Sequence, residues 1–138
     1  MNRPYVHWET VEVRWGDMDA LGHVNNARYF TYCETARMSL FEALELSRFR
    51  TEPRLGVGLV HASLDFKQQV RFPANIEVGQ RVARIGGSSF TLEYGLYREG
   101  TALLVASGSA VVVWMDFEAG EALALPETLR STIEAYTA

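Results

Sequence analysis

The sequence predicts an α+β fold, in which one long helix packs against an antiparallel sheet. Three features predict it: a long stretch without Gly or Pro that repeats apolar residues with helical spacing, several runs in which apolar and polar residues alternate, and short turns between those runs. The chain of 138 residues has a common length for one domain and shows no internal repeat or linker. We therefore expect a single domain spanning residues 1–138.

The first two expected elements are a strand and the long helix. Residues 5–15 alternate apolar and polar side chains, which is the period of a half-buried strand. Residues 25–46 lack Gly and Pro, and their apolar residues recur at three- and four-residue steps, as on the buried face of a helix. The side-chain oxygen of Asn25 or Asn26 is suited to cap the helix start. The recurring apolar residues are Tyr29, Cys33, Ala36, Leu40 and Leu44.

Four more strands are expected after the helix. In chain order, the segments are a loop (47–58), a strand of unusual length (60–72), a turn (73–80), three strands (81–87, 88–98 and 101–115) and a short terminal helix (126–138). Gly86 and Gly87 open a hairpin between two of these strands. The last strand is apolar or small on both faces, which is typical of a central strand covered on both sides.

The composition argues against several classes of function. A formal net charge of -4 and a pI near 5.4 do not fit a general nucleic-acid-binding surface, which needs a basic excess. The apolar runs are too short to span a bilayer, and the N-terminus lacks the uninterrupted apolar segment of a secretory signal. We therefore expect a cytoplasmic protein without a nucleic-acid or membrane partner.

Common cofactor and metal signatures do not occur. The chain contains no G-x-G-x-x-G, no G-x-x-x-x-G-K-S/T and no G-x-S-x-G pattern. Cys33 is the only cysteine, so an intrachain disulfide is excluded, and a thiolate metal cluster would need more cysteines. The three histidines, His7, His23 and His61, are scattered along the chain. We expect neither a metal nor an organic cofactor.

The most informative stretch is RWGDMDALGHVNNARYF, residues 14–30. It places Asp17 and Asp19 just before the helix, whose first N–H groups lack intrahelical acceptors and form an electrophilic pocket. A carboxylate near an acyl carbonyl bound there can attack it, or deprotonate a water that does, while the amides stabilise the oxyanion. These residue types match thioester hydrolysis. The spacing alone is equally explained if the Asp and Asn side chains only cap the helix and close a turn.

Two other residues of this stretch have a structural as well as a functional explanation. Gly22 is typical of a backbone position that needs a positive φ angle, which also suits the close approach of a ligand. His23 is typical of a loop residue that forms hydrogen bonds. Neither residue type points to a reaction by itself.

The longer segment VRWGDMDALGHVNNARYFTYCETAR resembles the opening signature of the hotdog-fold acyl-CoA thioesterases, the 4-hydroxybenzoyl-CoA thioesterase-like family. In that family an Asp, a Gly-containing loop and HVNNARY lead directly into the long central helix. The resemblance extends over roughly residues 8 to 117, because the expected order of elements is also the hotdog order. It implies a five-stranded antiparallel sheet wrapped around one long helix.

The resemblance also implies roles for individual residues. By position, the catalytic carboxylate falls on Asp19, and Asp17 is a supporting residue. The amide that polarises the thioester carbonyl falls on the backbone N–H of Asn26, while Gly22, His23 and Asn25 shape the loop. On the helix, Glu34 and Arg37 resemble family positions, and an ion pair between residues three apart explains them as well.

The expected contacts with coenzyme A differ from those of some relatives. Members that act on aromatic substrates carry basic residues just before the Ser-Phe of the next strand, where these residues meet the phosphates, whereas this chain has GGSSF. Arg84, Arg81, Lys67 and Arg71 are the available substitutes, although each is also explained as a solvated charge on a strand. The residues expected around the substrate are Tyr29, His61, Lys67, Arg84, Ser88 and Ser89.

The function implied by this resemblance is hydrolysis of a thioester of coenzyme A or of an acyl carrier protein, with Asp19 as general base or nucleophile. Two alternatives keep the same fold. One is a non-enzymatic acyl-CoA-binding domain, against which the presence of Asp19 argues. The other is an acyl-CoA hydratase or dehydratase, which usually needs an Asp and a His together, here Asp19 and His23.

The expected assembly is a homodimer or homotetramer. The long strand would form a hazardous unpaired edge if left alone, and a domain of this size cannot cover its own apolar flank. The resemblance implies dimers through continuous sheets, with active sites shared between subunits. The neighbour's long strand, around residues 61–67, is expected to close the pocket beside Asp19.

Overall fold

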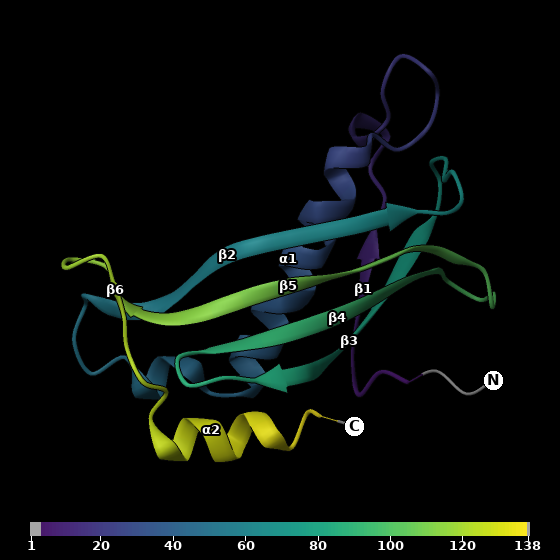
Figure 1. The fold of residues 1–138 in the computed structure, drawn as a ribbon. Coiled ribbons are helices and arrows are strands. Elements are labelled where there is room, and N and C mark those ends of the chain that lie inside the picture. Colours follow the sequence, from purple (N-terminus) through teal and green to yellow (C-terminus); the bar gives the residue numbers. More distant parts are fainter. Residues whose placement is uncertain (1–3, 138) are drawn as a thin grey trace.

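The computed structural model describes residues 4–137, which form one long helix, five long strands and several shorter elements (Figure 1). In chain order these are β1 (His7–Glu12), the 3-10 helix η1 (Trp15–Asp17), α1 (Asn26–Ala43), the 3-10 helix η2 (Leu46–Phe49), β2 (Leu55–Phe66), β3 (Asn75–Ile85), β4 (Ser89–Arg98), β5 (Leu104–Asp116), β6 (Glu121–Ala122) and α2 (Glu127–Glu134). The order of the major elements is the predicted one, and the two-residue β6 is an addition.

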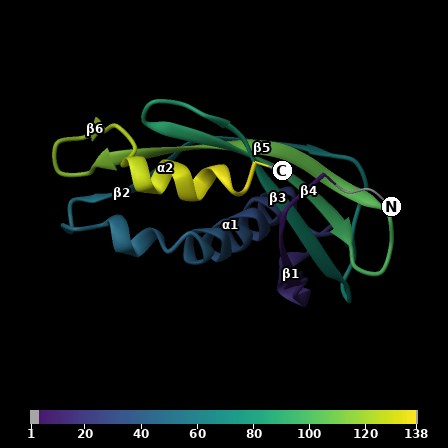
Figure 2. The same cartoon turned by 90° about the horizontal axis from the view of Figure 1, so that it is seen from below.

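All strands belong to one antiparallel sheet with the order β1-β3-β4-β5-β2, and β6 pairs with the end of β5. The sheet curls around α1, which lies against its concave side (Figure 2). The predicted arrangement, a five-stranded antiparallel sheet wrapped around one long helix, is confirmed. As expected, β5 is a central strand, but α1 covers only one of its faces.

The helix packs through the residues that the spacing predicts. Tyr29, Cys33, Ala36, Leu40 and Leu44 are each at most 4% exposed, and they join one apolar cluster with the inner face of the sheet. Burial of such side chains is the main force that holds the helix on the sheet. The helix begins at Asn26 and ends at Ala43, earlier than expected, because the chain turns through a left-handed residue, Glu45 (φ +53°), into η2.

The long strand is displaced from its predicted position. β2 spans Leu55–Phe66 rather than residues 60–72, so the Gly-containing part of the expected loop is strand. Gly56 and Gly58 are required there because the Phe117 and Met115 side chains lie over them, 2.7 and 2.8 Å from where a Cβ would be. Beyond Phe66 the chain leaves the sheet.

The next strand is longer than predicted. β3 starts at Asn75, inside the segment expected to be a turn. Its inward residues Ile76, Val78 and Gln80 are fully buried, and Gly79 between them leaves room for the Trp8 ring, 2.8 Å from where a Cβ would be. Gly79 and the buried Gln80 interrupt the alternation of apolar and polar residues, so that alternation does not predict the first half of β3.

One edge of the sheet is open in the single chain. β2 is the last strand in the order, and its residues 59–63 are exposed. Leu59 and Val60 are 48% and 59% exposed there, although they are apolar. Across residues 4–137, no helix is long and apolar enough to cross a membrane.

Candidate functional site

Asp19 begins a tight turn between η1 and α1. The N–H of Asp19 donates to the carbonyl of His23 (3.0 Å), and the N–H of Gly22 donates to the carbonyl of Asp19 (3.0 Å). Gly22 has a φ of +80°, as its residue type predicts, in the left-handed region that costs other residues about 1–2 kcal/mol. The N–H of Leu21 also donates to Oδ1 of Asp19 (2.9 Å), so the turn itself orients the carboxylate.

The start of α1 follows directly on this turn. The N–H of Asn25 donates to the carbonyl of Asp17 (2.9 Å), and the side-chain oxygen of Asn25 caps the helix by accepting from the N–H of Ala27 (2.9 Å). Asn26 is the first helical residue, and within residues 4–137 no acceptor is bonded to its N–H. This N–H is open to a ligand at the helix end where aligned peptide dipoles place partial positive charge.

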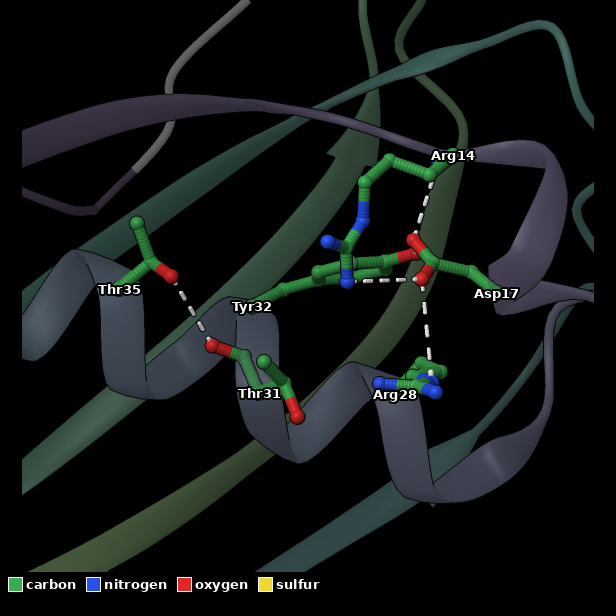
Figure 3. A network of polar contacts seen from close by, with 6 residues as sticks. All are labelled: Arg14, Asp17, Arg28, Thr31, Tyr32 and Thr35. Carbon is green, nitrogen blue, oxygen red and sulfur yellow. Dashed lines mark hydrogen bonds and ion pairs between the residues drawn. The ribbon is translucent and has the colours of Figure 1, made fainter.

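A network of polar contacts surrounds the buried Asp17 (Figure 3). This residue is 1% exposed, and its Oδ2 accepts from the Tyr32 hydroxyl (2.7 Å) and from the Arg14 N–H (3.0 Å). Its Oδ1 accepts from the Arg14 guanidinium (3.3 Å) and lies 3.8 Å from Nε of Arg28. Asp17 therefore ties the loop to the first two turns of α1.

The charge of Asp17 is stabilised in place. Burial by itself raises the pKa of Asp17, but the hydrogen bonds from Arg14 and Tyr32 and the charge of Arg14 outweigh it, so the pKa lies below its usual value. Burial and the bond to Asp17 raise the pKa of Tyr32, so its hydroxyl stays a donor. Asp17 does not line the hollow beside Asp19.

A hollow of about 440 Å³ opens beside the turn and the helix start. Of the residues predicted for the site, it brings together Asp19, His23, Asn25, Asn26, Tyr29 and Lys67. Gly22 shapes the turn without lining the hollow. The hollow is thus lined both by a residue with a carboxylate and by a residue with an unbonded helix N–H, two groups that can assist attack on a carbonyl.

The sequence did not reveal the far wall of this hollow. Phe66, Gln68 and Gln69 line it from the end of β2 and the segment after it. Phe66 packs edge-to-face on Tyr29, with ring centroids 5.4 Å apart. Only the alternation of apolar residues placed Phe66 toward the helix, and nothing local indicated that the strand ends there.

The single chain leaves the predicted Ser88 and Ser89 far from Asp19. Ser89 pairs with Val113 of β5, and Val113 pairs with Gly58 near the start of β2. The Asp19 hollow lies at the other end of that strand, at Phe66. The separation along β2 is eight residues, or about 26 Å of extended chain.

Three other predicted substrate residues are also outside the hollow. His61 is exposed in the middle of the open edge strand, and Arg84 is exposed on β3. Arg81 is paired, because its guanidinium donates to the Glu93 carboxylate at 2.8 and 2.9 Å. Within one chain, only Lys67 and Arg71 of the four basic substitutes lie near Asp19.

Two further hollows follow the seam between α1 and β2. The larger, about 780 Å³, lies beside the C-terminal half of the helix and is lined by Met38, Phe41 and Leu59 among others. The smaller, about 160 Å³, lies nearer the helix start, with Phe30 and Leu64 in its wall. Apolar side chains from the helix and the long strand line much of the seam, and charged residues such as Glu42 and Arg48 also line the larger hollow.

Arg37 lies where these two hollows meet. It lines both, is 6% exposed, and donates from a guanidinium nitrogen to the Tyr94 hydroxyl (3.2 Å). None of the ion pairs found within residues 4–137 joins it to Glu34, so an ion pair does not explain these two residues. Burial raises the pKa of the neighbouring Cys33 to about 12, which keeps this cysteine a neutral thiol.

Backbone supplies positive potential beside the hollow. The positive end of α1 and the unbonded N–H of Asn26, which lines the hollow, can stabilise negative charge that develops on an oxygen atom. Within residues 4–137, no group of three or more His, Cys, Asp or Glu side chains is arranged to hold a metal ion. The chemistry that this geometry suits is attack on a carbonyl group whose oxygen needs stabilisation.

Known proteins are similar to this chain in sequence and in fold. A family model described as the thioesterase-like superfamily matches residues 13–133. The long-chain acyl-CoA thioesterase FadM of Escherichia coli is 25% identical over 124 residues, which cover 90% of this chain and 94% of FadM.

Solved structures extend the comparison. The PA2801 protein of Pseudomonas aeruginosa is 31% identical with a TM-score of 0.85, covering 94% of this chain and 98% of that protein. A 1,4-dihydroxy-2-naphthoyl-CoA thioesterase from Synechocystis shares the fold, with a TM-score of 0.82 at 20% identity, and the match covers 92% of this chain and 94% of that one.

Proposed function

Because the chain belongs to the thioesterase-like superfamily and has its hotdog fold, we propose that it hydrolyses acyl-CoA thioesters, with Asp19 as the reacting carboxylate. One observation carries the assignment of the site: Asp19 and Asn26, whose N–H is unbonded within residues 4–137, line the same hollow. The similarity to FadM, a long-chain acyl-CoA thioesterase, supports coenzyme A as the thiol. An acyl carrier protein is the alternative carrier.

In the proposed reaction, the thioester carbonyl oxygen accepts a hydrogen bond from the N–H of Asn26. This oxygen becomes negative when the carbonyl carbon is attacked, so the N–H and the dipole of α1 stabilise the transition state more than the substrate. One such donor contributes about 2.7 to 4 kcal/mol. The turn that contains Gly22 holds Asp19 ready beside the carbonyl.

Asp19 serves in one of two roles. As a nucleophile, it attacks the carbonyl carbon, expels the coenzyme A thiolate and forms a mixed anhydride, which water then hydrolyses. As a general base, it takes a proton from the attacking water and returns it to the departing thiolate. Both routes consume one water and release the free acid and coenzyme A.

We place the acyl group along the seam between α1 and β2. The hollows there begin near the Asp19 hollow, at Phe30 and Leu64, and widen toward Met38 and Phe41. Apolar walls of this kind bind aliphatic or aromatic chains through burial of their surface.

A second copy of the chain is part of the proposed site. The open edge of β2 and the exposed side chains of Leu59 and Val60 are suited to pair with the same strand of a partner around a two-fold axis. Antiparallel pairing brings the start of one β2 toward the end of the other. Ser88 and Ser89, which are far from Asp19 in their own chain, then approach the hollow of the partner.

This pairing changes one expectation about the shared site. Lys67 already lines the hollow of its own chain, so residues 61–67 need not come from a neighbour. The segment that a two-fold axis carries to the hollow is instead the start of β2, from Leu55. We propose a homodimer, or a homotetramer built from such dimers.

The hydratase alternative has one observation in its favour, because His23 lines the same hollow as Asp19. However, Nε2 of His23 lies 3.3 Å from the Arg71 guanidinium, which can only donate. In this contact the ring nitrogen accepts from Arg71, so Arg71 competes for it with any substrate group. Thioester hydrolysis by Asp19 agrees better with the contacts of both residues.

The central test replaces Asp19 by Asn. The amide keeps the shape of the side chain and an oxygen for the Leu21 N–H, but it removes the base or nucleophile. We expect kcat to fall by about a thousandfold or more, with an unchanged melting temperature and Kd for a non-hydrolysable acyl-CoA analogue. A panel of acyl-CoA esters, assayed by release of free thiol and by hydration of enoyl esters, separates a hydrolase from a hydratase and from a binding protein. Near wild-type turnover in this variant would exclude Asp19 as the reacting group.

A further inference from the structure

We propose that the phosphates of coenzyme A bind in a basic cradle formed by Lys67, Arg71 and Arg98 beside the Asp19 hollow. This inference rests on the proposed acyl-CoA hydrolysis and names the part of the chain that recognises the nucleotide. It differs from the expectation based on the GGSSF segment, which lies at the other end of the sheet within one chain and reaches an Asp19 hollow only in the proposed dimer.

The cradle is a hollow of about 710 Å³ at the open end of the sheet. The three cations line it, and its described lining contains no Asp or Glu. His23, Lys67, Gln68 and Gln69 line both the cradle and the Asp19 hollow, so the two spaces adjoin. A coenzyme whose thioester is held at Asp19 therefore has the cradle directly beside the reaction centre.

Three distant segments build the cradle. After β2 ends at Phe66, the N–H groups of Lys67 and Gln68 both donate to the carbonyl of Val105, at 2.9 and 3.2 Å. The chain is anchored again at Val70, which is 2% exposed and whose carbonyl accepts from the N–H of Val24 (2.8 Å).

These anchors fix the backbone between Lys67 and Arg71, and they tie it to the catalytic turn. The Arg71 guanidinium then reaches His23 (3.3 Å) on that turn. Arg98 enters from the end of β4, where it pairs with Ile76. The cations are thus carried by backbone that is held in place, although their side chains are exposed.

Most other basic side chains already have a partner within the chain. Arg14, Arg28, Arg48, Arg54 and Arg81 each have a carboxylate within ion-pair distance. Arg37, Arg50 and Arg130 donate to a hydroxyl or to backbone carbonyls. In the described part of the chain, Arg84 on β3 resembles the cradle residues in lacking an ion pair. No ion pair within residues 4–137 involves Lys67, Arg71 or Arg98. In a chain with a net charge of -4, three unneutralised cations around one concave surface concentrate positive potential there.

The chemistry of coenzyme A fits this surface. Its pantetheine arm joins the thioester to a nucleotide with a diphosphate bridge and a 3′-phosphate, and a phosphomonoester carries about -1.5 to -2 charges at neutral pH. Arginine binds phosphate oxygens with two parallel N–H groups, while lysine acts as a point charge. An acyl carrier protein offers the cradle a single bridging phosphate in place of the several phosphates of coenzyme A, and it also brings an extended protein surface.

The test compares one acyl group on two carriers, coenzyme A and phosphate-free pantetheine. In the double variant Arg71→Ala/Arg98→Ala, we expect the ratio of kcat/KM for the coenzyme A ester to that for the pantetheine ester to fall about tenfold, at about threefold for each exposed cation. Lys67→Ala added to it should lower the ratio further. Raising the salt concentration should weaken only the coenzyme A ester, because screening acts on exposed charges.

Arg84→Ala is the comparison variant, since it removes one positive charge from an exposed position on β3. A fall in the ratio for Arg84→Ala but not for the double variant would place the phosphates elsewhere and overturn the proposal. So would an unchanged ratio in the double variant. A double variant that loses hydrolysis of acyl carrier protein esters, but not of coenzyme A esters, would identify the cradle as a protein-docking surface instead.

Failure of the proposed function is detected separately. If the wild-type protein hydrolyses neither ester, calorimetric titration with coenzyme A itself still tests the cradle. We then expect the Kd of coenzyme A to rise about tenfold in the double variant, while Arg84→Ala leaves it unchanged. Equal affinities in the wild type and the double variant would overturn the proposal whatever the protein catalyses.

Discussion

Replacing Asp17 by Asn tests whether this buried carboxylate holds the catalytic loop rather than reacting. The Asn oxygen can take the place of Oδ2 and keep the bonds from the Tyr32 hydroxyl and the Arg14 N–H. The Asn amino group then takes the place of Oδ1 and faces the guanidinium groups of Arg14 and Arg28, which also only donate. The variant therefore loses two ion pairs and weakens two hydrogen bonds.

The size of the effect follows from exposure. The Arg14 and Arg28 side chains are 70% and 44% exposed, so solvent screens both pairs and each contributes at most about 1 kcal/mol. The two remaining bonds lose the strength that a charged acceptor adds, about 0.5 kcal/mol each. We expect a total loss of about 2 to 3 kcal/mol in unfolding free energy, or a melting temperature lower by about 10 °C. Turnover of the folded variant should change less than about threefold.

The pH dependence gives an independent check. The pKa of Asp17 is lowered in the folded protein, so its charge contributes stability above the unfolded pKa near 3.9, and this contribution is lost as the pH falls through the folded value. The stability difference between wild type and variant should thus be constant from about pH 5 upward and shrink below about pH 4. Denaturant unfolding across this range measures it. Our assignment is refuted if Asp17→Asn abolishes turnover at unchanged stability while Asp19→Asn retains it.

Three further predictions concern the turn, the assembly and the electrophile. Gly22→Ala should lower the free energy of unfolding by about 1–2 kcal/mol and kcat by about tenfold. The control Gly100→Ala, at a similar φ of +77°, should lower the free energy of unfolding alone. If the two variants had equal kcat values, the turn would not position Asp19. Light scattering should give at least twice the 15.5 kDa mass of one chain. The variant Val60→Asp places a charge on the open edge of β2, so it should dissociate the assembly and reduce activity. An active wild-type species of 15.5 kDa would exclude the shared site. Turnover should survive EDTA, and its loss with recovery on added zinc would contradict a backbone electrophile.

Local chemistry explains which elements the sequence could predict. The helix follows from side chains three and four residues apart, and its start follows from the capping oxygen of Asn25, so both can be recognised within a short window. The turn at Gly22 is equally local. The residues around Asp19 were predictable because most of them are neighbours in the chain, although their roles came from the family resemblance.

The errors concern features that distant residues decide. Gly56 and Gly58 indicate a loop until Phe117 and Met115, about sixty residues later, are known to lie over them. Likewise, Gly79 is a strand residue because Trp8 needs the space. The positions of Ser88 and Arg98 relative to Asp19 depend on strand register, so no local pattern could supply them.

The loop that carries Asp19 and the residues that line the seam are different parts of the chain, and this separation affects how such proteins can diversify. The proposed reacting carboxylate and oxyanion donor lie within eight residues, Asp19–Asn26, and most contacts that hold them lie among residues 14–32, with further contacts from residues 70–72. The walls of the seam, such as Met38, Phe41 and Leu59, take no part in those contacts. Mutations that reshape the seam can therefore accumulate, in nature or in a designed library, without disturbing the loop. On the proposed mechanism, a new acyl preference requires new seam residues while the residues that react stay the same.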